Sequence, residues 1–168
     1  MSTISTRRLT LRAATLEIAR ADARDDRAAL AALLDVKPPE DWPPPLFGED
    51  RLVYHKGLEA HPDRVGWLGW YWILTSERVL VGCGGVSWPG PHGDVEVGYS
   101  VVASHRGQGY APEALEAMMQ WAFNNPAARR IVAHTFPHLA PSIRVLEKSG
   151  FKETGLSADG VLMYERGK

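Results

Sequence analysis

The chain has 168 residues, of which 45% are hydrophobic and 23% charged, and its formal net charge is −1. This length and composition predict one globular domain, residues 1–168, with a single core. A near-neutral charge argues against a general nucleic-acid binder, and no stretch approaches the roughly 20 apolar residues that a membrane helix requires. The N-terminus lacks the apolar run of a secretory signal, and a single cysteine cannot form an internal disulfide, so we expect a cytoplasmic protein.

The first 60 residues are predicted to hold one strand followed by helices. Polar and apolar residues alternate over Arg8–Arg12, as they do in a strand. Thr15 can cap a helix, and the alanine- and leucine-rich segment Leu16–Val36 predicts one or two amphipathic helices. Five prolines within Lys37–Pro45 exclude regular structure, so this segment is predicted to be an ordered loop, and Asp50–Ala60 is expected to be helical again.

A β-rich region follows. Trp67–Thr75 and Val79–Trp88 predict a hairpin, and Asp94–Val102 predicts the third strand of a meander. Cys83 lies in an apolar, glycine-rich run, where a small core residue is expected. A catalytic thiol would require a nearby positive group, and no adjacent residue supplies one.

The C-terminal part is predicted to combine helices and strands. Its first helix has an apolar stripe at helical spacing, and Gly150 is expected just past the end of the second. The predicted elements are helices over Tyr110–Asn125 and Ser142–Ser149 and strands over Arg130–Thr135, Phe151–Thr154 and Val161–Arg166. The whole order predicts a mixed α/β (α+β) sheet domain.

The most informative local feature is the turn Ser104–Ala111, which joins a predicted strand to a predicted helix. Unpaired N–H groups and a partial positive charge at a helix N-terminus attract anions. Gly107 and Gly109 let the backbone amides converge on one oxyanion, and Arg106 adds a positive charge. These features favour a pyrophosphate cradle. The turn has neither the Walker pattern nor the dinucleotide-binding glycine pattern, and the alternative is a glycine-rich turn with a solvated arginine.

Read together with its neighbours, this turn resembles the acyl-CoA motif of the GNAT acetyltransferases, Arg/Gln-x-x-Gly-x-Gly/Ala. Two further segments resemble the second motif of the family and the opening strand of its RimJ/RimL-type branch. The resemblance spans about residues 8–151, and the matching residues are Arg106, Gly109 and Ala111 in the turn, Ser142–Phe151 in the second motif, and Arg7–Arg12 and Glu96–Tyr99 for the branch.

The resemblance implies a central, twisted, mostly antiparallel mixed sheet, flanked by helices, whose two middle strands splay apart around the pantetheine arm. It implies acetyl-CoA as co-substrate, an amine as acceptor and no metal, with no nucleic-acid or membrane partner, in a monomer or homodimer. It assigns CoA binding to the strand before the motif and to the turn: Tyr99, Val101, Val102, Arg106, Gly107, Gln108, Gly109, Tyr110 and Ala111.

The sequence departs from the family pattern at two positions. An asparagine common in the second motif is replaced by Leu139, so a side-chain contact to the cofactor is expected to be lost. The tyrosine that many members use as general acid is replaced by Leu146. The RimJ/RimL-type branch also tends to lack that tyrosine, and the serine at the position of Ser142 is its usual substitute.

Acyl transfer to an amine requires a base, a group that holds the developing oxyanion and a proton donor for the thiolate. Glu96 is the candidate base, acting through a water molecule, and its alternative is a cross-strand ion pair. Ser142 is the candidate donor, and it can instead, or in addition, cap the helix that follows. The backbone N–H of Val101 or Val102 can hold the oxyanion. Lesser candidates are Tyr99, His134 and His138.

The acceptor pocket is expected to use Trp42–Tyr54, Trp67–Trp72 and the Trp88–Gly93 loop. Six tryptophans can line a cleft for a cationic or aromatic amine, or they can fill the core and the sheet edges. The predicted function is transfer of an acetyl group from acetyl-CoA to a primary amine of a small molecule or protein N-terminus. The alternatives are an acyl-CoA-binding sensor or interaction module without activity and a transferase for a different acyl group.

Overall fold

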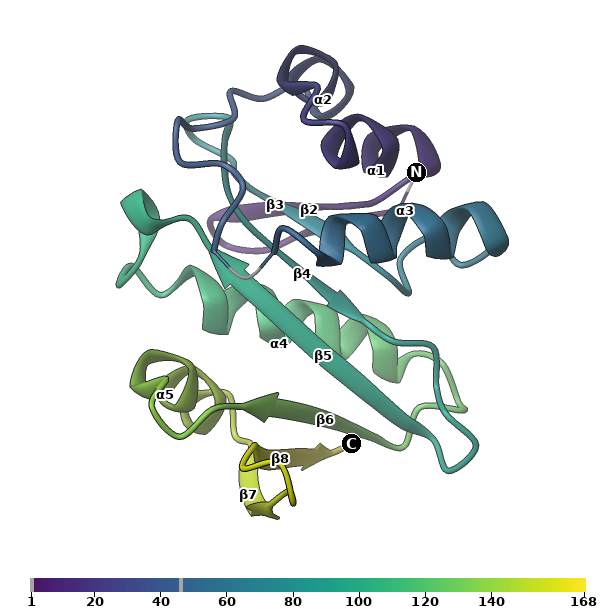
Figure 1. Ribbon diagram of the computed structural model, residues 1–168, viewed down its shortest axis with the longest axis vertical. Helices are drawn as coiled ribbons and strands as arrows, with labels where there is room; N and C mark the ends of the chain where they lie inside the picture. Colours follow the sequence, from purple (N-terminus) through teal and green to yellow (C-terminus); the bar gives the residue numbers. More distant parts are fainter. Residues whose placement is uncertain (1, 46) are drawn as a thin grey trace.

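The computed structural model describes residues 2–45 and 47–168, which form one eight-stranded sheet covered by helices on both faces (Figure 1). The mixed α/β prediction is confirmed. The strands are β1 (Thr3–Ser5), β2 (Leu9–Ala13), β3 (Trp70–Leu74), β4 (Val79–Val86), β5 (Asp94–Val101), β6 (Arg130–Thr135), β7 (Lys152–Leu156) and β8 (Leu162–Gly167). The helices are α1 (Leu16–Ala23), α2 (Arg27–Leu34), α3 (Asp50–Ala60), α4 (Tyr110–Phe123) and α5 (Ala140–Lys148).

The two faces of the sheet carry separate apolar cores because strand side chains alternate between the faces. In β3, Trp70 and Trp72 pack with α4, whereas Tyr71 and Ile73 pack with α1, α2 and α3. Cys83 is buried in this second core, as the sequence predicted. Among the described residues, no helix is long and apolar enough to cross a membrane.

The strand order is β1-β2-β3-β4-β5-β6-β8-β7, and only β5 and β6 pair in parallel. Their pairing covers Asp94–Val97 and Arg130–Ala133 and ends there. Beyond this point β5 stays with β4 and β6 stays with β8, so the two strands diverge (Figure 1). The splayed pair expected from the family resemblance is therefore present.

Two local features differ from the prediction. The edge strand β1, which pairs with β2, was not predicted, because three residues are too few to establish an alternating pattern. Leu16–Val36 forms two helices, in agreement with the prediction of one or two, and Asp26 caps α2 by accepting a hydrogen bond from Ala29 N. Helix α5 begins at Ala140 and not at Ser142, because Pro141 fits the first turn of a helix.

Candidate active site

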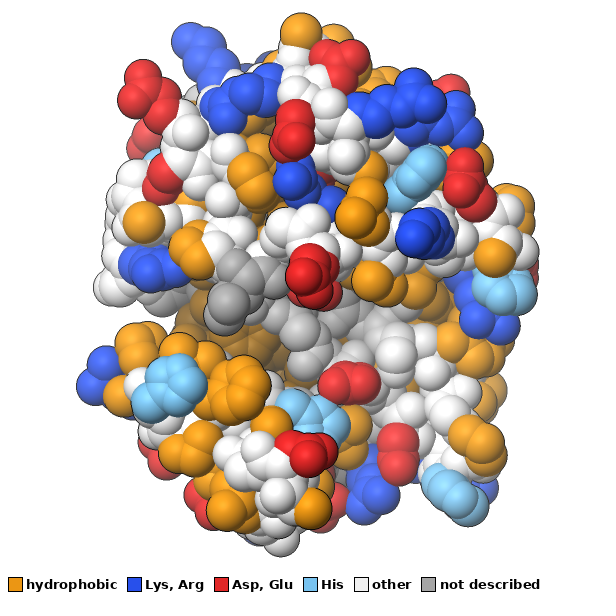
Figure 2. Space-filling model, viewed as in Figure 1, with side chains coloured by type: hydrophobic (Ala, Val, Ile, Leu, Met, Phe, Trp, Pro, Cys, Tyr) orange, Lys and Arg blue, Asp and Glu red, His pale blue; other side chains and the backbone are white. Residues whose placement is uncertain are grey.

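A cavity of about 340 Å³ lies where β5 and β6 diverge. The molecular surface is hollowed above α5, on the left of the space-filling view (Figure 2). The wall combines α3 and the preceding loop with β4, β5, β6 and the start of α5. The lining residues are Phe47, Asp50, Tyr54, Cys83, Gly84, Val97, Gly98, Tyr99, Ser100, Ala133, His134, Thr135, Phe136, Leu139, Ser142 and Val161.

The turn that precedes α4 has the geometry of an anion cradle. Gly107 and Gly109 adopt φ angles of +74° and +79°, a left-handed conformation that favours glycine. Gly109 is the N-cap of α4, and no side chain caps this helix, so its first N–H groups are left for another partner. A Cβ on Gly107 would meet nothing within 4 Å, and the Arg106 side chain is exposed. This open, positively polarised turn fits the pyrophosphate of CoA.

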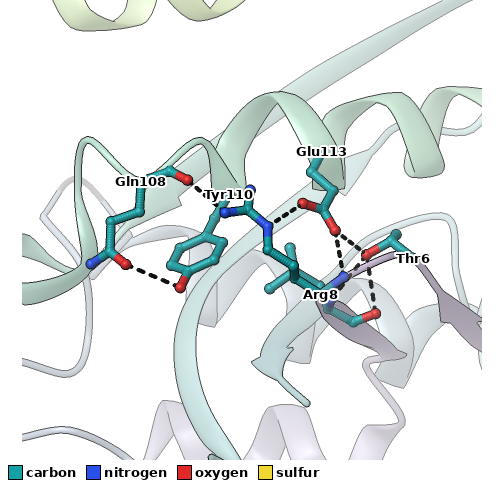
Figure 3. Close-up of polar contacts among 6 residues, drawn as sticks. Thr6, Arg8, Gln108, Tyr110 and Glu113 are labelled. Carbon is teal, nitrogen blue, oxygen red and sulfur yellow. Dashed lines mark hydrogen bonds and ion pairs between the residues drawn. The ribbon is translucent and has the colours of Figure 1, made fainter. Parts of the chain in front are cut away.

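Arg8 braces this turn from the N-terminal segment (Figure 3). Its Nη1 donates to the Gln108 carbonyl at 2.8 Å, its Nε donates to Glu113 Oε2 at 2.7 Å, and its guanidinium lies 4.7 Å from the centre of the Tyr110 ring. Thr6 Oγ1 and the Arg8 backbone N–H both donate to Glu113 Oε1. Desolvation opposes ionisation of Glu113, but these hydrogen bonds hold the pKa of its carboxyl below the usual value.

We expect Arg8→Ala to weaken CoA binding about 10-fold, the scale of one charge-assisted hydrogen bond in a partly exposed position. The turn would lose the donor that fixes its Gln108 carbonyl. Calorimetric titration with CoA checks this. The matched control is Arg166→Ala, because Arg166 likewise joins a carboxylate, Glu116, to a backbone carbonyl, that of Ser149. An equal loss of affinity in both variants would contradict a specific role for Arg8.

The backbone of β5 narrows the candidates for the oxyanion donor. The Val102 N–H donates to the Val81 carbonyl at 3.1 Å, so the prediction of Val102 as a possible donor is wrong. Because hydrogen bonds alternate along an antiparallel strand, the N–H groups of Tyr99 and Val101 point to the other edge, toward the gap. Arg106 Nε also donates to the Val101 carbonyl at 3.2 Å, which ties the turn to this edge.

Glu96 forms a cross-strand pair with His134, the pairing weighed as an alternative for this residue. His134 Nδ1 lies 2.9 Å from Glu96 Oε1, with the two side chains 42% and 60% exposed. A carboxylate accepts hydrogen bonds, so in the neutral imidazole the tautomer that satisfies this contact carries its proton on Nδ1 and has Nε2 as an acceptor. Among the described residues, His134 lines the cavity and Glu96 does not. The pair is arranged as an imidazole oriented by a carboxylate.

Ser142 lies inside the first turn of α5, and the N-cap position is occupied by Leu139. The interpretation of Ser142 as N-cap is therefore wrong, for the reason given above for Pro141. The Tyr99 hydroxyl lies 3.2 Å from the Ser142 carbonyl oxygen and 3.3 Å from Ser142 Oγ. Burial raises the pKa of Tyr99 to about 12, although the Ser142 contact lowers it. Leu146 is buried in the core.

The tryptophans do not form the acceptor wall: none of the six lies among the described residues that line the cavity. Trp70 and Trp72 are fully buried in the core, and Trp42 donates its Nε1–H to the buried carboxylate of Asp22. Of the segments expected to form the acceptor pocket, Trp42–Tyr54 contributes Phe47, Asp50 and Tyr54 to the lining, whereas Trp67–Trp72 and Trp88–Gly93 contribute no described lining residue. The core-filling alternative is correct for most of these tryptophans, and the exposed Trp88 packs against the ring of Trp67.

Comparison with known proteins gives a consistent result. A sequence model described as acetyltransferase (GNAT) domain matches residues 8–152. An uncharacterized N-acetyltransferase of Bacillus subtilis, YjdG, is 27% identical over 152 residues, which cover 90% of each chain. The structure of Mycobacterium smegmatis RimJ in complex with CoA-disulfide is 27% identical, with a TM-score of 0.67 over 99% of this chain and 87% of that one. A RimL structure in complex with coenzyme A reaches a TM-score of 0.71 at 21% identity, covering 99% of this chain and 98% of the other.

Proposed function

Because the chain belongs to the acetyltransferase (GNAT) domain family, we propose that it transfers the acetyl group of acetyl-CoA to a primary amine. The observation that carries the proposal is the cavity at the β5–β6 divergence, which is lined by a tyrosine–serine pair and by His134, the imidazole that Glu96 contacts. Residues 1–168 would act as a single cytoplasmic domain, as monomer or homodimer, without a metal.

Acetyl-CoA would supply an activated acetyl group as a thioester. The turn residues Arg106, Gly107, Gln108, Gly109, Tyr110 and Ala111 would hold its pyrophosphate, with Arg8 bracing them. Tyr99 and Val101 would offer backbone groups to the pantetheine arm along the free edge of β5. The Val101 N–H would also hold the negative charge that develops on the acetyl oxygen.

The acceptor reaches the cavity as an ammonium ion and must lose a proton before it attacks. His134 Nε2 would take this proton, directly or through a water molecule, while Glu96 Oε1 stabilises the charged imidazole. In this proposal Glu96 would act in deprotonation through His134 and not through a water molecule alone.

The departing thiolate needs a proton, and the Tyr99 hydroxyl would donate it. With a pKa of about 12, the Tyr99 hydroxyl is protonated at neutral pH, so the proton is present. Because the same shift makes Tyr99 a weaker acid than a free tyrosine, the transfer requires that its partner stabilise the tyrosinate. Ser142 Oγ, 3.3 Å from the Tyr99 hydroxyl, would then pass its own proton to the tyrosinate while taking one from solvent water, so that neither hydroxyl is left ionised. In this proposal Ser142 acts in proton donation as the partner of a tyrosine from β5.

We expect Tyr99→Phe and Ser142→Ala each to lower kcat by about 10-fold or more, the lower scale of lost acid catalysis. The KM for acetyl-CoA should change little. If the two hydroxyls form one relay, the double variant is no slower than the slower single variant. Tyr164→Phe is the control, because the Tyr164 hydroxyl bonds Glu153 and not Ser142. Full kcat in both single variants would rule out the relay.

The proposed function is tested by release of free CoA thiol from acetyl-CoA in the presence of a panel of primary amines. Release that depends on the amine supports the enzyme. Tight binding of CoA without turnover across the panel favours the alternative, a sensor or interaction module that binds acyl-CoA. Faster release from propionyl-CoA than from acetyl-CoA would instead assign a different acyl group.

A further inference from the structure

The cavity has an uneven distribution of charge. Among the described residues that line it, Asp50 is the sole carboxylate, and there is no lysine or arginine. A site that binds a free amino acid needs a positive partner for the substrate carboxylate. The described residues of this wall provide no lysine or arginine to pair with an anionic group next to the reacting amine.

Asp50 lies in the first turn of α3, exposed at the mouth of the cavity. The adjacent cation, Arg51, is turned toward α1, where its Nη1 bonds Asp25 Oδ1 at 2.5 Å and the Asp22 carbonyl at 2.9 Å. In the described part of the chain, no ion pair involves Asp50. Desolvation and the neighbouring charge of Glu49 both raise the pKa of Asp50, as expected for a carboxylate without a cation.

The groups around Asp50 are aromatic. Phe47 is buried and its ring centre lies 5.4 Å from that of Tyr54, so the two rings form a continuous apolar surface beside the carboxylate. Phe136, which is 49% exposed, adds a third ring on the side of β6. A carboxylate beside aromatic faces suits a cationic ligand with an apolar body.

On the basis of the proposed function, we propose that Asp50 selects the acceptor: a primary amine with an apolar or aromatic body and no carboxylate beside the amine. The carboxylate attracts the incoming ammonium group toward His134 and Tyr99. The same charge repels an amino acid, whose own carboxylate would lie near Asp50 without a cation to neutralise it.

Three acceptors of one shape test this: phenethylamine, phenylalaninamide and phenylalanine. Phenethylamine stands for small amines and phenylalaninamide for peptide N-termini, and both lack the carboxylate. We expect both to be acetylated with a kcat/KM at least about 10-fold above that of phenylalanine, the scale of one charge–charge interaction in a partly solvated site.

Asp50→Asn should reduce the ratio of kcat/KM between phenethylamine and phenylalanine to about 3-fold or less. Phenethylamine would lose its attraction to the carboxylate, which raises its KM, and phenylalanine would lose the repulsion. Glu49→Gln is the matched control. It removes the same charge one residue earlier, from an exposed side chain outside the cavity wall. The ratio of kcat/KM between the two acceptors should therefore stay that of the parent protein.

Equal use of phenylalanine and phenethylamine by the parent protein would overturn the inference, and so would an unchanged ratio of kcat/KM in Asp50→Asn. An equal decrease of this ratio in Glu49→Gln would also overturn the inference, because the effect would then arise from the overall surface charge and not from Asp50. Absence of thiol release with all three acceptors, and with the wider panel, would instead refute the proposed acetyl transfer itself.

Discussion

Replacing Gly109 with valine is expected to weaken CoA binding at least ~100-fold, because several charge-assisted hydrogen bonds from one turn would be lost together. A β-branched residue is strongly disfavoured at the φ of +79° that Gly109 adopts. Its Cβ would also lie 3.4 Å from Arg8 Nη2, against the group that braces the turn. The N–H groups at the start of α4 would no longer converge on the pyrophosphate. Calorimetric titration with CoA measures the effect.

Gly160→Val is the control that distinguishes loss of the anion-binding turn from a general effect of backbone strain. Gly160 has a φ of +75° in the turn between β7 and β8, and a Cβ there would meet nothing within 4 Å. The two variants should lose similar thermal stability, and only Gly109→Val should lose CoA affinity. Parent-like affinity in a folded Gly109→Val protein would remove the turn from the site.

Glu96→Gln is expected to lower turnover by ~10²-fold, the usual scale for loss of general-base catalysis. The amide oxygen of glutamine can still accept the hydrogen bond from Nδ1, so His134 would lose chiefly the charge that stabilises its protonated form. His134→Gln should cost about as much, and the double variant should be no slower than the slower single variant. The KM for acetyl-CoA should stay near that of the parent in all three. Steady-state kinetics with the best amine from the panel measures these values.

Asp94→Asn is the matched control on the same strand. Asp94 also forms a cross-strand pair, with Arg130 at 2.6 Å, but its partner, unlike His134, is not among the described residues that line the cavity. Its variant should turn over like the parent protein. Near-parent activity in Glu96→Gln would leave the Glu96–His134 pair with a structural role alone.

Much of the fold could be predicted because many of its helices and strands have a recognisable local sequence pattern. The strict alternation at the start of Asp94–Val101 and the apolar stripe of Tyr110–Phe123 each specify one element, and both elements are confirmed. The glycines at 107 and 109 specify a left-handed turn between them. Thr15 caps α1 as predicted, because a hydroxyl before an apolar helix has a partner within three residues.

The remaining features depend on contacts between distant segments. Arg8 reaches Gln108 across 100 positions of the chain, and no pattern around Arg8 distinguishes it from an exposed strand residue. Tyr99 and Ser142 meet only because α5 closes over the end of β5. Composition alone also left two roles open for the tryptophans, a cleft or the core, and most of them are buried in the two cores.

Measuring both products of one reaction, with acetyl-CoA and phenethylamine as substrates, tests acetyl transfer by this site. We expect free CoA thiol and an amine one acetyl group heavier, detected by mass spectrometry, to appear in equal amounts. We also expect both to fall together in Gly109→Val and Glu96→Gln. Thiol release without acetylated amine, or CoA binding without either product across the panel of amines, would contradict acetyl transfer by this site.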